Sequence, residues 1–306
     1  MNVLIIGLGS IAFKHIAALR EIEPDVNIYA LRSSNEAENY PEIYNIHTIE
    51  EMLVPAKFTI ISTPTQLHEP AIIQALKLKC PIFIEKPVLG ELKNVDILSN
   101  AIEQSNVLTY VACNMRFHPA IQFIKQYLDL NRPTINEVNV YCGSYLPEWR
   151  PGRDFRNMYS ANKEMGGGVH LDLIHELDYC KWLFGCPNQI TSIKRSVSSL
   201  EIEAADFAQF GLLYNTFTIN ITLNYYRKDA RRRLEIVTNT ETLEVNLLTS
   251  TVSSLETNKT LYSGIFSMAD TYIQQLRFFL EQVDKGGKSM NDFNEGVDVL
   301  KMALHE

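Results

Sequence analysis

Two short segments carry side chains whose types and spacing suit proton and hydride chemistry. The first is Glu85-Lys86-Pro87, in which a proline follows the lysine directly. A residue before proline is held extended, so Lys86 is fixed at the end of the apolar run 81–84. A rigidly held ammonium there could donate a hydrogen bond to a substrate hydroxyl and lower its pKa, or anchor a bound cofactor. The alternative is a solvated surface lysine, because most lysines lie at the surface.

The second segment begins with the three glycines 166–168 and contains Asp172 and His175. The glycines allow a close backbone approach at the start of a helix that we expect to run to about Phe184. Residues three apart share one helix face, so the Asp172 carboxylate would orient the imidazole of His175 and support its charged form. His175 could then take the proton of a hydroxyl while hydride leaves the same carbon. The alternative is that Asp172 stabilises the helix N-terminus and His175 is a packed core histidine.

Arginines and aromatic residues alternate through the segment 145–156. Arginine forks match phosphate or carboxylate groups, and aromatic faces stack on sugars or bases. We therefore expect an anionic, ring-bearing substrate to contact four of its side chains: Tyr145, Arg150, Arg153 and Arg156. A charged surface loop is the alternative. A second basic run, Lys228 with Arg231-Arg232-Arg233, is expected to be a solvated turn.

The N-terminus contains the pattern of a nucleotide-binding turn. An apolar run, 3–6, ends in Gly-x-Gly-x-x-Ala, and a helical pattern follows at once. The first glycine permits the tight turn, the second lets the backbone approach a pyrophosphate, and the small alanine lets the helix pack on its strand. The helix N-terminus offers unpaired N–H groups and a positive dipole end to an anion. We predict dinucleotide binding by Gly7, Gly9, Ser10, Ile11 and Ala12, against the alternative of a glycine-rich turn that binds nothing.

Strands and helices alternate through the first third of the chain. Strands are expected at 3–6, 26–31, 58–61, 81–84 and 108–113, with helices following them at 65–79 and 91–104. This alternation predicts an α/β domain with a doubly wound parallel sheet. Ligands of such sheets bind beyond the carboxyl ends of the strands, which is where segments 7–12, 62–65, 85–87 and 114–118 lie.

The pattern changes after residue 118. We expect a helix at 119–129, a strand near 137–145 and an irregular loop at 146–165, then strand-like runs at 189–197, 206–214, 216–225, 233–238 and 241–247. Strands joined by short turns favour antiparallel pairing, so residues 119–306 are predicted to form an α+β domain with one large open, mostly antiparallel sheet. Helices are expected at 268–283 and from residue 295. The first domain is expected to comprise residues 1–118.

Composition limits the class of protein. The 306 residues suffice for about two domains, and contents of 46% hydrophobic and 21% charged residues are globular values. A net charge of −8 argues against nucleic acid as the main partner. Five scattered cysteines without a Cys-x-x-Cys pair indicate a reducing cytoplasm. No apolar run reaches the roughly 20 residues of a membrane span. The spacing of His170, Asp172, His175 and Cys180 is not that of a structural zinc site, so we expect no metal.

Taken together, these motifs resemble the glucose–fructose oxidoreductase / inositol dehydrogenase (Gfo/Idh/MocA) family, and the likeness covers nearly the whole chain. It rests on the glycine turn, Thr63-Pro64 with His68, Glu85-Lys86-Pro87, Asn114-x-Arg116-Phe117-His118 and the glycine-led segment that runs through Asp178. The resemblance implies a Rossmann domain, a second domain built on an open mixed sheet, and hydride transfer to or from a sugar-like carbon with NAD(H) or NADP(H). It implies catalytic roles for Lys86, Asp172 and His175, although the family commonly spaces this Asp and His by four residues and here the spacing is three.

The same resemblance implies binding roles for further residues. Cofactor contacts are expected from Thr63, Pro64, His68, Glu85 and Lys86, and substrate contacts from Arg116, His118 and Asp172 as well as from the segment 145–156. The choice of cofactor depends on the end of the second strand, where a carboxylate would accept from the ribose 2′-OH and favour NAD. The chain has Arg32-Ser33-Ser34 there and no carboxylate until Glu36. Because arginine and hydroxyls suit a 2′-phosphate, we expect NADP rather than NAD, contacted by Arg32 and Ser33.

The expected activity is therefore that of an NAD(P)-dependent oxidoreductase acting on a CH–OH group of a sugar. The substrate is expected to be a small-molecule sugar or nucleotide-sugar, as in family members that act on nucleotide-linked or amino sugars in bacterial surface polysaccharide synthesis. Two alternatives remain: a catalytically silent NAD(P)-binding sensor or co-regulator of the same fold, and a reductase of a non-sugar carbonyl. Because exposed sheet faces must be covered, we also expect a cytoplasmic homo-oligomer joined through the C-terminal sheet.

Overall fold

The computed structural model describes residues 1–34, 38–287 and 290–305, and these fall into two compact units. The first unit comprises Met1–Asn114 and Met268–Leu300, and the second comprises Met115–Ser267 and Lys301–Glu306. The chain thus leaves the first unit close to the expected boundary at residue 118. It then returns, because the segment 268–300, expected in the second domain, packs with the first.

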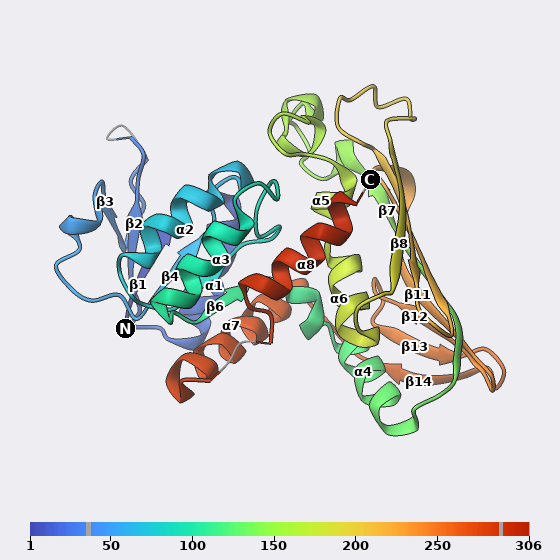
Figure 1. The fold of residues 1–306 in the computed structure, drawn as a ribbon. Coiled ribbons are helices and arrows are strands. Elements are labelled where there is room, and N and C mark those ends of the chain that lie inside the picture. The colour runs from blue at the N-terminus through green and yellow to red at the C-terminus, as the bar shows by residue number, and fades with distance from the viewer. Residues whose placement is uncertain (35–37, 288–289, 306) are drawn as a thin grey trace. The chain divides into compact units, whose positions relative to one another are not determined.

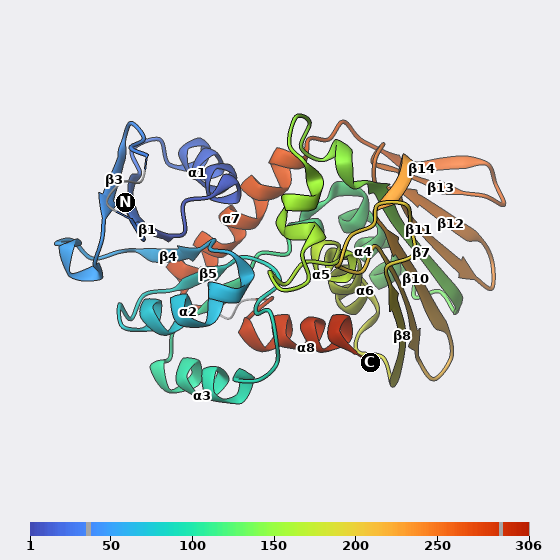
Figure 2. The same cartoon turned by 90° about the horizontal axis from the view of Figure 1, so that it is seen from above.

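The first unit is built on a parallel sheet of six strands in the order β3-β2-β1-β4-β5-β6. The strands are β1 (Asn2–Ile6), β2 (Asn27–Leu31), β3 (Ile43–Ile46), β4 (Phe58–Ile61), β5 (Ile82–Ile84) and β6 (Thr109–Val111). The helices are α1 (Ser10–Ile22), α2 (His68–Leu76), α3 (Val95–Ser105), α7 (Met268–Lys285) and, as far as Leu300, α8 (Phe293–Leu304). In Figures 1 and 2, α1 and α7 lie on one face of this sheet, and α2 and α3 lie on the other. The predicted doubly wound parallel sheet is confirmed.

An aromatic cluster explains why the chain returns to this unit. Phe58 and Phe83 come from neighbouring strands, and both pack edge-on against Phe279 of α7, with ring centroids 5.1 and 5.4 Å away. Tyr110 of β6 stacks on Phe83. All four rings are fully buried. Burial of one such side chain stabilises a fold by roughly 1.5–3 kcal/mol, so the cluster holds α7 on the sheet.

The second unit is built on an eight-stranded sheet in the order β14-β13-β12-β11-β7-β10-β9-β8. Its strands are β7 (Ile135–Tyr145), β8 (Gln189–Arg195), β9 (Phe207–Leu213), β10 (Thr218–Asn224), β11 (Tyr226–Thr238), β12 (Thr242–Asn246), β13 (Thr251–Ser254) and β14 (Lys259–Ser263). Only the β7–β10 pair is parallel, so the predicted large, mostly antiparallel sheet is confirmed. Helices α4 (Pro119–Asn131), α5 (Val169–Asp172) and α6 (His175–Phe184) lie along one face of it (Figure 2).

Short 3-10 helices occupy several connections. They are η1 (Ile49–Glu51), η2 (Thr65–Leu67), η3 (Asn114–Phe117), η4 (Leu146–Glu148), η5 (Phe155–Asn157) and η6 (Tyr159–Ala161). The last three lie in the segment that was expected to be an irregular loop. Across the described ranges, the helices lack the combination of length and hydropathy needed to cross a bilayer.

Two local predictions are wrong in the second unit. The basic run 228–233 is not a solvated turn but lies within β11, where Arg232 pairs in register with Cys142 of β7. Strand alternation exposes about half of the Arg231 and Arg233 side chains and only 15% of the Arg232 side chain. The expected single helix 166–184 is also interrupted. It ends at Asp172, passes through a turn at Leu173 and Ile174, and resumes at His175.

Candidate functional site

The turn after β1 packs closely against the turn after β4. Gly7 has a φ of +94°, and a Cβ added there would lie 2.5 Å from the backbone nitrogen of Thr63 at the end of β4. The Ser62 hydroxyl donates to the Gly7 carbonyl at 2.7 Å and holds the two turns together. Only glycine combines this backbone conformation with this approach, so the residue is required by the turn itself.

The backbone at Gly9 and Ser10 is open to the outside. Among the described residues other than its two chain neighbours, none places a heavy atom within 4 Å of a Cβ built at Gly9, and both Gly9 and Ser10 are exposed. Gly9 is the N-cap of α1 and lacks a side-chain oxygen that could take up the first helical N–H groups. Ala12, fully buried, lets α1 lie close to the sheet. Backbone N–H groups of the Ser10 and Ile11 turn are therefore suited to hold a pyrophosphate at the helix N-terminus.

Thr63, Pro64 and His68 follow β4 on the same edge of the sheet. His68 is buried, and its ring nitrogens lie 3.2 Å from the carbonyl oxygen of Val88 and 3.1 Å from that of Thr63. Burial lowers the pKa of His68, against the opposing effect of these two carbonyl oxygens. The ring thus links the turns that follow β4 and β5. Its expected cofactor contact stays a prediction.

Glu85 and Lys86 follow β5, the next strand of the sheet. Glu85 is buried, and its Oε1 lies 2.5 Å from Nε2 of His15, a fully buried residue of α1. Its Oε2 accepts a hydrogen bond from the backbone N–H of Lys86 at 3.1 Å. Burial alone would raise the pKa of Glu85, but the hydrogen bond and charge of His15, with the Lys86 ammonium, lower it. The backbone N–H of Lys86 is therefore held by a carboxylate that His15 itself holds in place.

The end of β2 bears on cofactor choice. The Arg32 guanidinium donates to the carbonyl oxygen of Glu38 at 3.2 Å and to Oδ1 of Asn45 at 3.1 Å, while Ser33 is exposed. Arg32 is thus oriented by the segment that leads into β3. The expectation drawn from Glu36 concerns a residue outside the described ranges.

In the second unit, Asp172 and His175 stand on either side of the helix break. Asp172 closes α5, and its Oδ2 accepts a hydrogen bond of 2.5 Å from the hydroxyl of Tyr225. Burial, followed by the Asp172 carboxylate, raises the pKa of Tyr225, which keeps this hydroxyl a donor. His175 is the first residue of α6. Because the helix is interrupted, the rule that residues three apart share a face does not apply to this pair.

Two buried ion pairs hold the first turn of α6. Arg116 donates to both carboxylate oxygens of Asp178, at 3.0 and 2.8 Å, and both side chains are almost fully buried. Arg232 of β11 donates to Glu176 at 2.6 Å. The sequence reasoning missed Glu176 and Arg232 because their pairing depends on the register of β11 with β7. The only hint in the sequence was that Glu176 and Asp178 lie among apolar residues of the helix, where a buried carboxylate needs a partner.

Arg116 and His118 both make structural contacts within the second unit: Arg116 pairs with Asp178, as described above. His118 caps α4: its Nδ1 accepts from the N–H of Ala120, and its Nε2 donates to the carbonyl of Leu247. Both side chains are buried. Their expected substrate contacts stay predictions.

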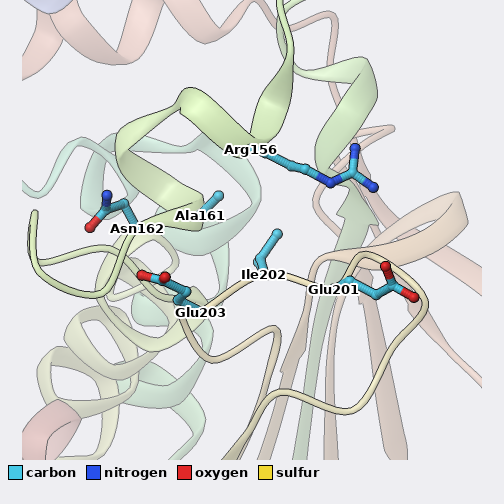
Figure 3. Close-up of a pocket in the computed structure, with 6 residues that line it drawn as sticks. All are labelled: Arg156, Ala161, Asn162, Glu201, Ile202 and Glu203. Atoms are coloured by element: carbon cyan, nitrogen blue, oxygen red, sulfur yellow. The ribbon is translucent and has the colours of Figure 1, made fainter.

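The segment 145–156 leads into a cavity of about 230 Å³ in the second unit. Arg156, Asn162, Glu201 and Glu203 line it with Ala161 and Ile202, whose side chains point into it (Figure 3). Arg150, Arg153 and Arg156 are exposed, and the Lys228 ammonium lies 5.5 Å from the ring centre of Tyr145. The expected substrate contacts of Tyr145, Arg150, Arg153 and Arg156 stay predictions. Within the described ranges, His, Cys, Asp and Glu side chains do not gather in a group that could hold a metal ion.

Comparisons with known proteins give a match over the first unit. The family described as "Oxidoreductase family, NAD-binding Rossmann fold" matches residues 1–113. The scyllo-inositol 2-dehydrogenase (NAD(+)) of Bacillus subtilis (strain 168) is 30% identical over 135 residues, which are 44% of this chain and 36% of that protein. The 2,7-anhydro-N-acetylneuraminate hydratase of Escherichia coli (strain K12) is 24% identical over 200 residues, 63% of this chain and 52% of that protein. The chain thus spans about a third to a half of the lengths of these relatives.

The whole fold also has a solved counterpart. The structure of UDP-N-acetylglucosamine 3-dehydrogenase from Acidithiobacillus ferrooxidans covers 99% of this chain and 95% of its own, with a TM-score of 0.81 and 19% identity. At this identity the likeness establishes the fold, with its parallel and its mostly antiparallel sheet.

Proposed function

Because residues 1–113 make the chain a member of the Gfo/Idh/MocA family of oxidoreductases, we propose that it transfers a hydride between a nicotinamide dinucleotide and a CH–OH carbon of a sugar or sugar derivative. One observation carries this proposal most directly. Strands β1, β4 and β5 are adjacent and parallel, so the glycine turn, Thr63-Pro64 and Lys86 follow the same edge of one sheet. That edge is where ligands of such sheets bind.

The dinucleotide, when bound, supplies the acceptor or donor of hydride. Gly7 and Gly9 would let the backbone approach its pyrophosphate, and the N–H groups at the start of α1 would stabilise the negative charge. Lys86 donates a hydrogen bond to the reacting oxygen, and its positive charge favours the alkoxide over the hydroxyl. The Lys86 backbone is held by Glu85, which limits the positions that the ammonium can reach.

His175 takes the proton of the reacting hydroxyl as a general base in the oxidation direction and returns it in reduction. Asp172 accepts a hydrogen bond from the Tyr225 hydroxyl through Oδ2, which helps to orient its carboxylate toward a substrate hydroxyl. The ion pairs of Glu176 and Asp178 hold the first turn of α6, so that the His175 backbone is fixed.

A substrate screen tests this proposal. Purified protein is incubated with sugars, sugar phosphates and UDP-sugars and each nicotinamide cofactor, and the absorbance of the reduced nicotinamide is followed. Lys86→Ala and His175→Ala should each lower kcat by about 10²-fold or more while cofactor affinity stays nearly unchanged, as expected for loss of proton transfer. Lys93→Ala, at an exposed lysine of the same unit, is the matched control and should keep full activity.

The outcomes separate the competing functions. Full activity of both variants would refute the proposed chemistry. A cofactor that binds but never changes redox state would favour a sensor. Conversion of a sugar derivative without net change in absorbance, detected by mass spectrometry, would favour a reaction of the kind named for the hydratase relative.

We further propose that NADP is preferred over NAD and that the substrate is a nucleotide-sugar. The Arg32 guanidinium and the exposed Ser33 hydroxyl, at the end of β2, support the first choice, and the exposed arginines of 145–156 support the second. Calorimetric titration with both cofactors tests the first, and tighter binding of NAD would refute it. Higher kcat/KM for the free sugar than for its UDP form would refute the second.

Assembly through the second unit is also proposed. The face of the eight-stranded sheet opposite its helices carries hydrogen-bonded polar side chains, among them Asn139, Asn220 and Glu235. Light scattering after size exclusion should give a multiple of the 34.9 kDa chain mass. A monomer mass would refute this proposal. The expected cytoplasmic location stays a prediction.

A further inference from the structure

We propose that His15 and Glu85 act together as positioning residues for Lys86, an inference that rests on the function proposed above. Both side chains are polar and buried, and neither is part of the glycine fingerprint or of the expected catalytic set. Glu85 was expected to contact the cofactor, whereas His15 was not among the expected site residues.

The histidine side of the pair is held rigidly. His15 is fully buried in α1, and its Nε2 lies 2.5 Å from Oε1 of Glu85. Its ring packs edge-on against Phe83 and Tyr272, with centroids 5.1 and 5.7 Å away. Because aromatic rings contact the imidazole, it cannot turn away without disturbing the core, and its hydrogen bond fixes the carboxylate of Glu85.

The carboxylate divides its two oxygens between different elements. Oε1 contacts His15 of α1, and Oε2 accepts the backbone N–H of Lys86 at 3.1 Å. The Glu85 backbone is in turn joined to β4 by the hydrogen bond from its N–H to the carbonyl of Ile61. Two hydrogen bonds thus connect the helix that begins at the glycine turn with the residue proposed to act on substrate. The position of Lys86 is set relative to the cofactor-binding helix.

A contribution to stability alone does not explain this pair. Taking an imidazole and a carboxylate out of water carries a desolvation cost that their attraction offsets only in good geometry, and apolar replacements of similar volume are often equally stable. An apolar pair, however, could not accept the N–H of Lys86. The two roles therefore separate in a double variant, His15→Phe/Glu85→Leu, which restores packing but not the hydrogen bond.

Kinetics with a substrate found in the screen give the first test. His15→Phe and the double variant should each lower kcat by about tenfold or more, since small misplacements of a reacting group have effects of this size. The Kd for NADPH, measured by fluorescence, should stay within about threefold, and the double variant should have a melting temperature near that of wild type. His15→Gln and Glu85→Gln, which keep a donor and an acceptor, should recover much of the lost kcat. Arg20→Ala, at a half-buried site of α1 whose partner is the exposed Glu42, is the control and should keep wild-type values.

Amide hydrogen exchange gives a second test that needs no turnover. In the protein without cofactor, the Lys86 amide should exchange at least tenfold faster in the double variant than in wild type, and Glu85→Gln should stay close to wild type. Unchanged exchange together with unchanged kcat in well-folded variants would overturn the inference. If no sugar is turned over but Lys86 exchange responds as expected, the proposed function fails while the positioning role stands. Should His15→Phe not fold, the double variant decides.

Discussion

The two units hold their polar residues by different means. In the first, Gly7, Thr63 and Lys86 follow the carboxyl ends of adjacent parallel strands, so hydrophobic pattern and chain order locate them. In the second, Asp172 and the start of α6 depend on partners from distant parts of the chain: Tyr225, Arg232 and Arg116. In the first unit, strand order thus places the functional residues and the buried pair of His15 and Glu85 adjusts only one of them, Lys86. In the second unit, buried pairs do most of this work, and a single substitution can leave one of their charges uncompensated.

Breaking the pair of Arg116 and Asp178 should have the largest effect. Asp178→Ala leaves a fully buried guanidinium without its bidentate partner, and the free energy of unfolding should fall by about 3–5 kcal/mol. Urea unfolding followed by circular dichroism measures it. The double variant Arg116→Met/Asp178→Leu removes both charges and should lose much less. An equal loss in the single and double variants would mean that packing, not charge, dominates here.

A second buried group of the same unit makes stability depend on pH. Burial, then the Arg232 charge, lowers the pKa of His118 to about 4, although its hydrogen bond to the Leu247 carbonyl opposes this. Between pH 6.5 and 4 the unfolded chain binds a proton that the folded chain does not, so stability falls as pH falls through this window. At about 1.4 kcal/mol per pH unit, the loss amounts to roughly 3 kcal/mol.

His118→Asn isolates this effect, because asparagine also caps helices but does not titrate. Urea midpoints measured from pH 7 to pH 4 should decline less steeply for the variant than for wild type. Parallel declines for the two proteins would show that protonation of His118 does not cause the loss of stability.

The difference between the two units also explains how much of the fold the sequence predicts. The strands near 3–6, 58–61 and 81–84 were predictable because both faces of a central parallel strand are buried, which gives unbroken apolar runs. β3 was missed because its four residues are mostly exposed or half-buried at the sheet edge. The glycine turn was predictable from its spacing, whereas the close approach of Thr63 to Gly7 needs the register of β4 with β1.

In the second unit, the sequence could not supply the long-range pairs. Arg232 looks like part of a solvated basic run until β11 pairs with β7 and turns it toward Glu176. The break after Asp172 has no glycine or proline to announce it. The other end of α5 also depends on a distant segment, because the N–H of Val169 donates to the carbonyl of Ala205.

Substitutions of Gly7 and Gly9 test the close packing of turns in the first unit. Gly7→Ala places a Cβ against the Thr63 backbone at positive φ and should lower the free energy of unfolding by about 2 kcal/mol, as well as cofactor affinity. Gly9→Ala meets open space, so it should fold normally and weaken only cofactor binding. Thermal unfolding and fluorescence titration with NADPH separate the two. Equal melting temperatures for both variants would contradict the close approach at Gly7.

The smallest effect is expected where an ion pair is exposed. Lys125 and Asp129 of α4 are four residues apart with Nζ–Oδ1 at 2.7 Å, a distance as short as that in the buried pairs. Solvent screens this pair, since 28% and 60% of its side chains are exposed, so Lys125→Ala should change the free energy of unfolding by only about 0.3–0.5 kcal/mol. Urea unfolding in low and high salt measures it, and Lys125→Gln controls for the loss of the long side chain. A loss comparable to that of Asp178→Ala would mean that distance rather than burial decides the strength of ion pairs in this unit, and the contrast between its buried and exposed charges would not hold.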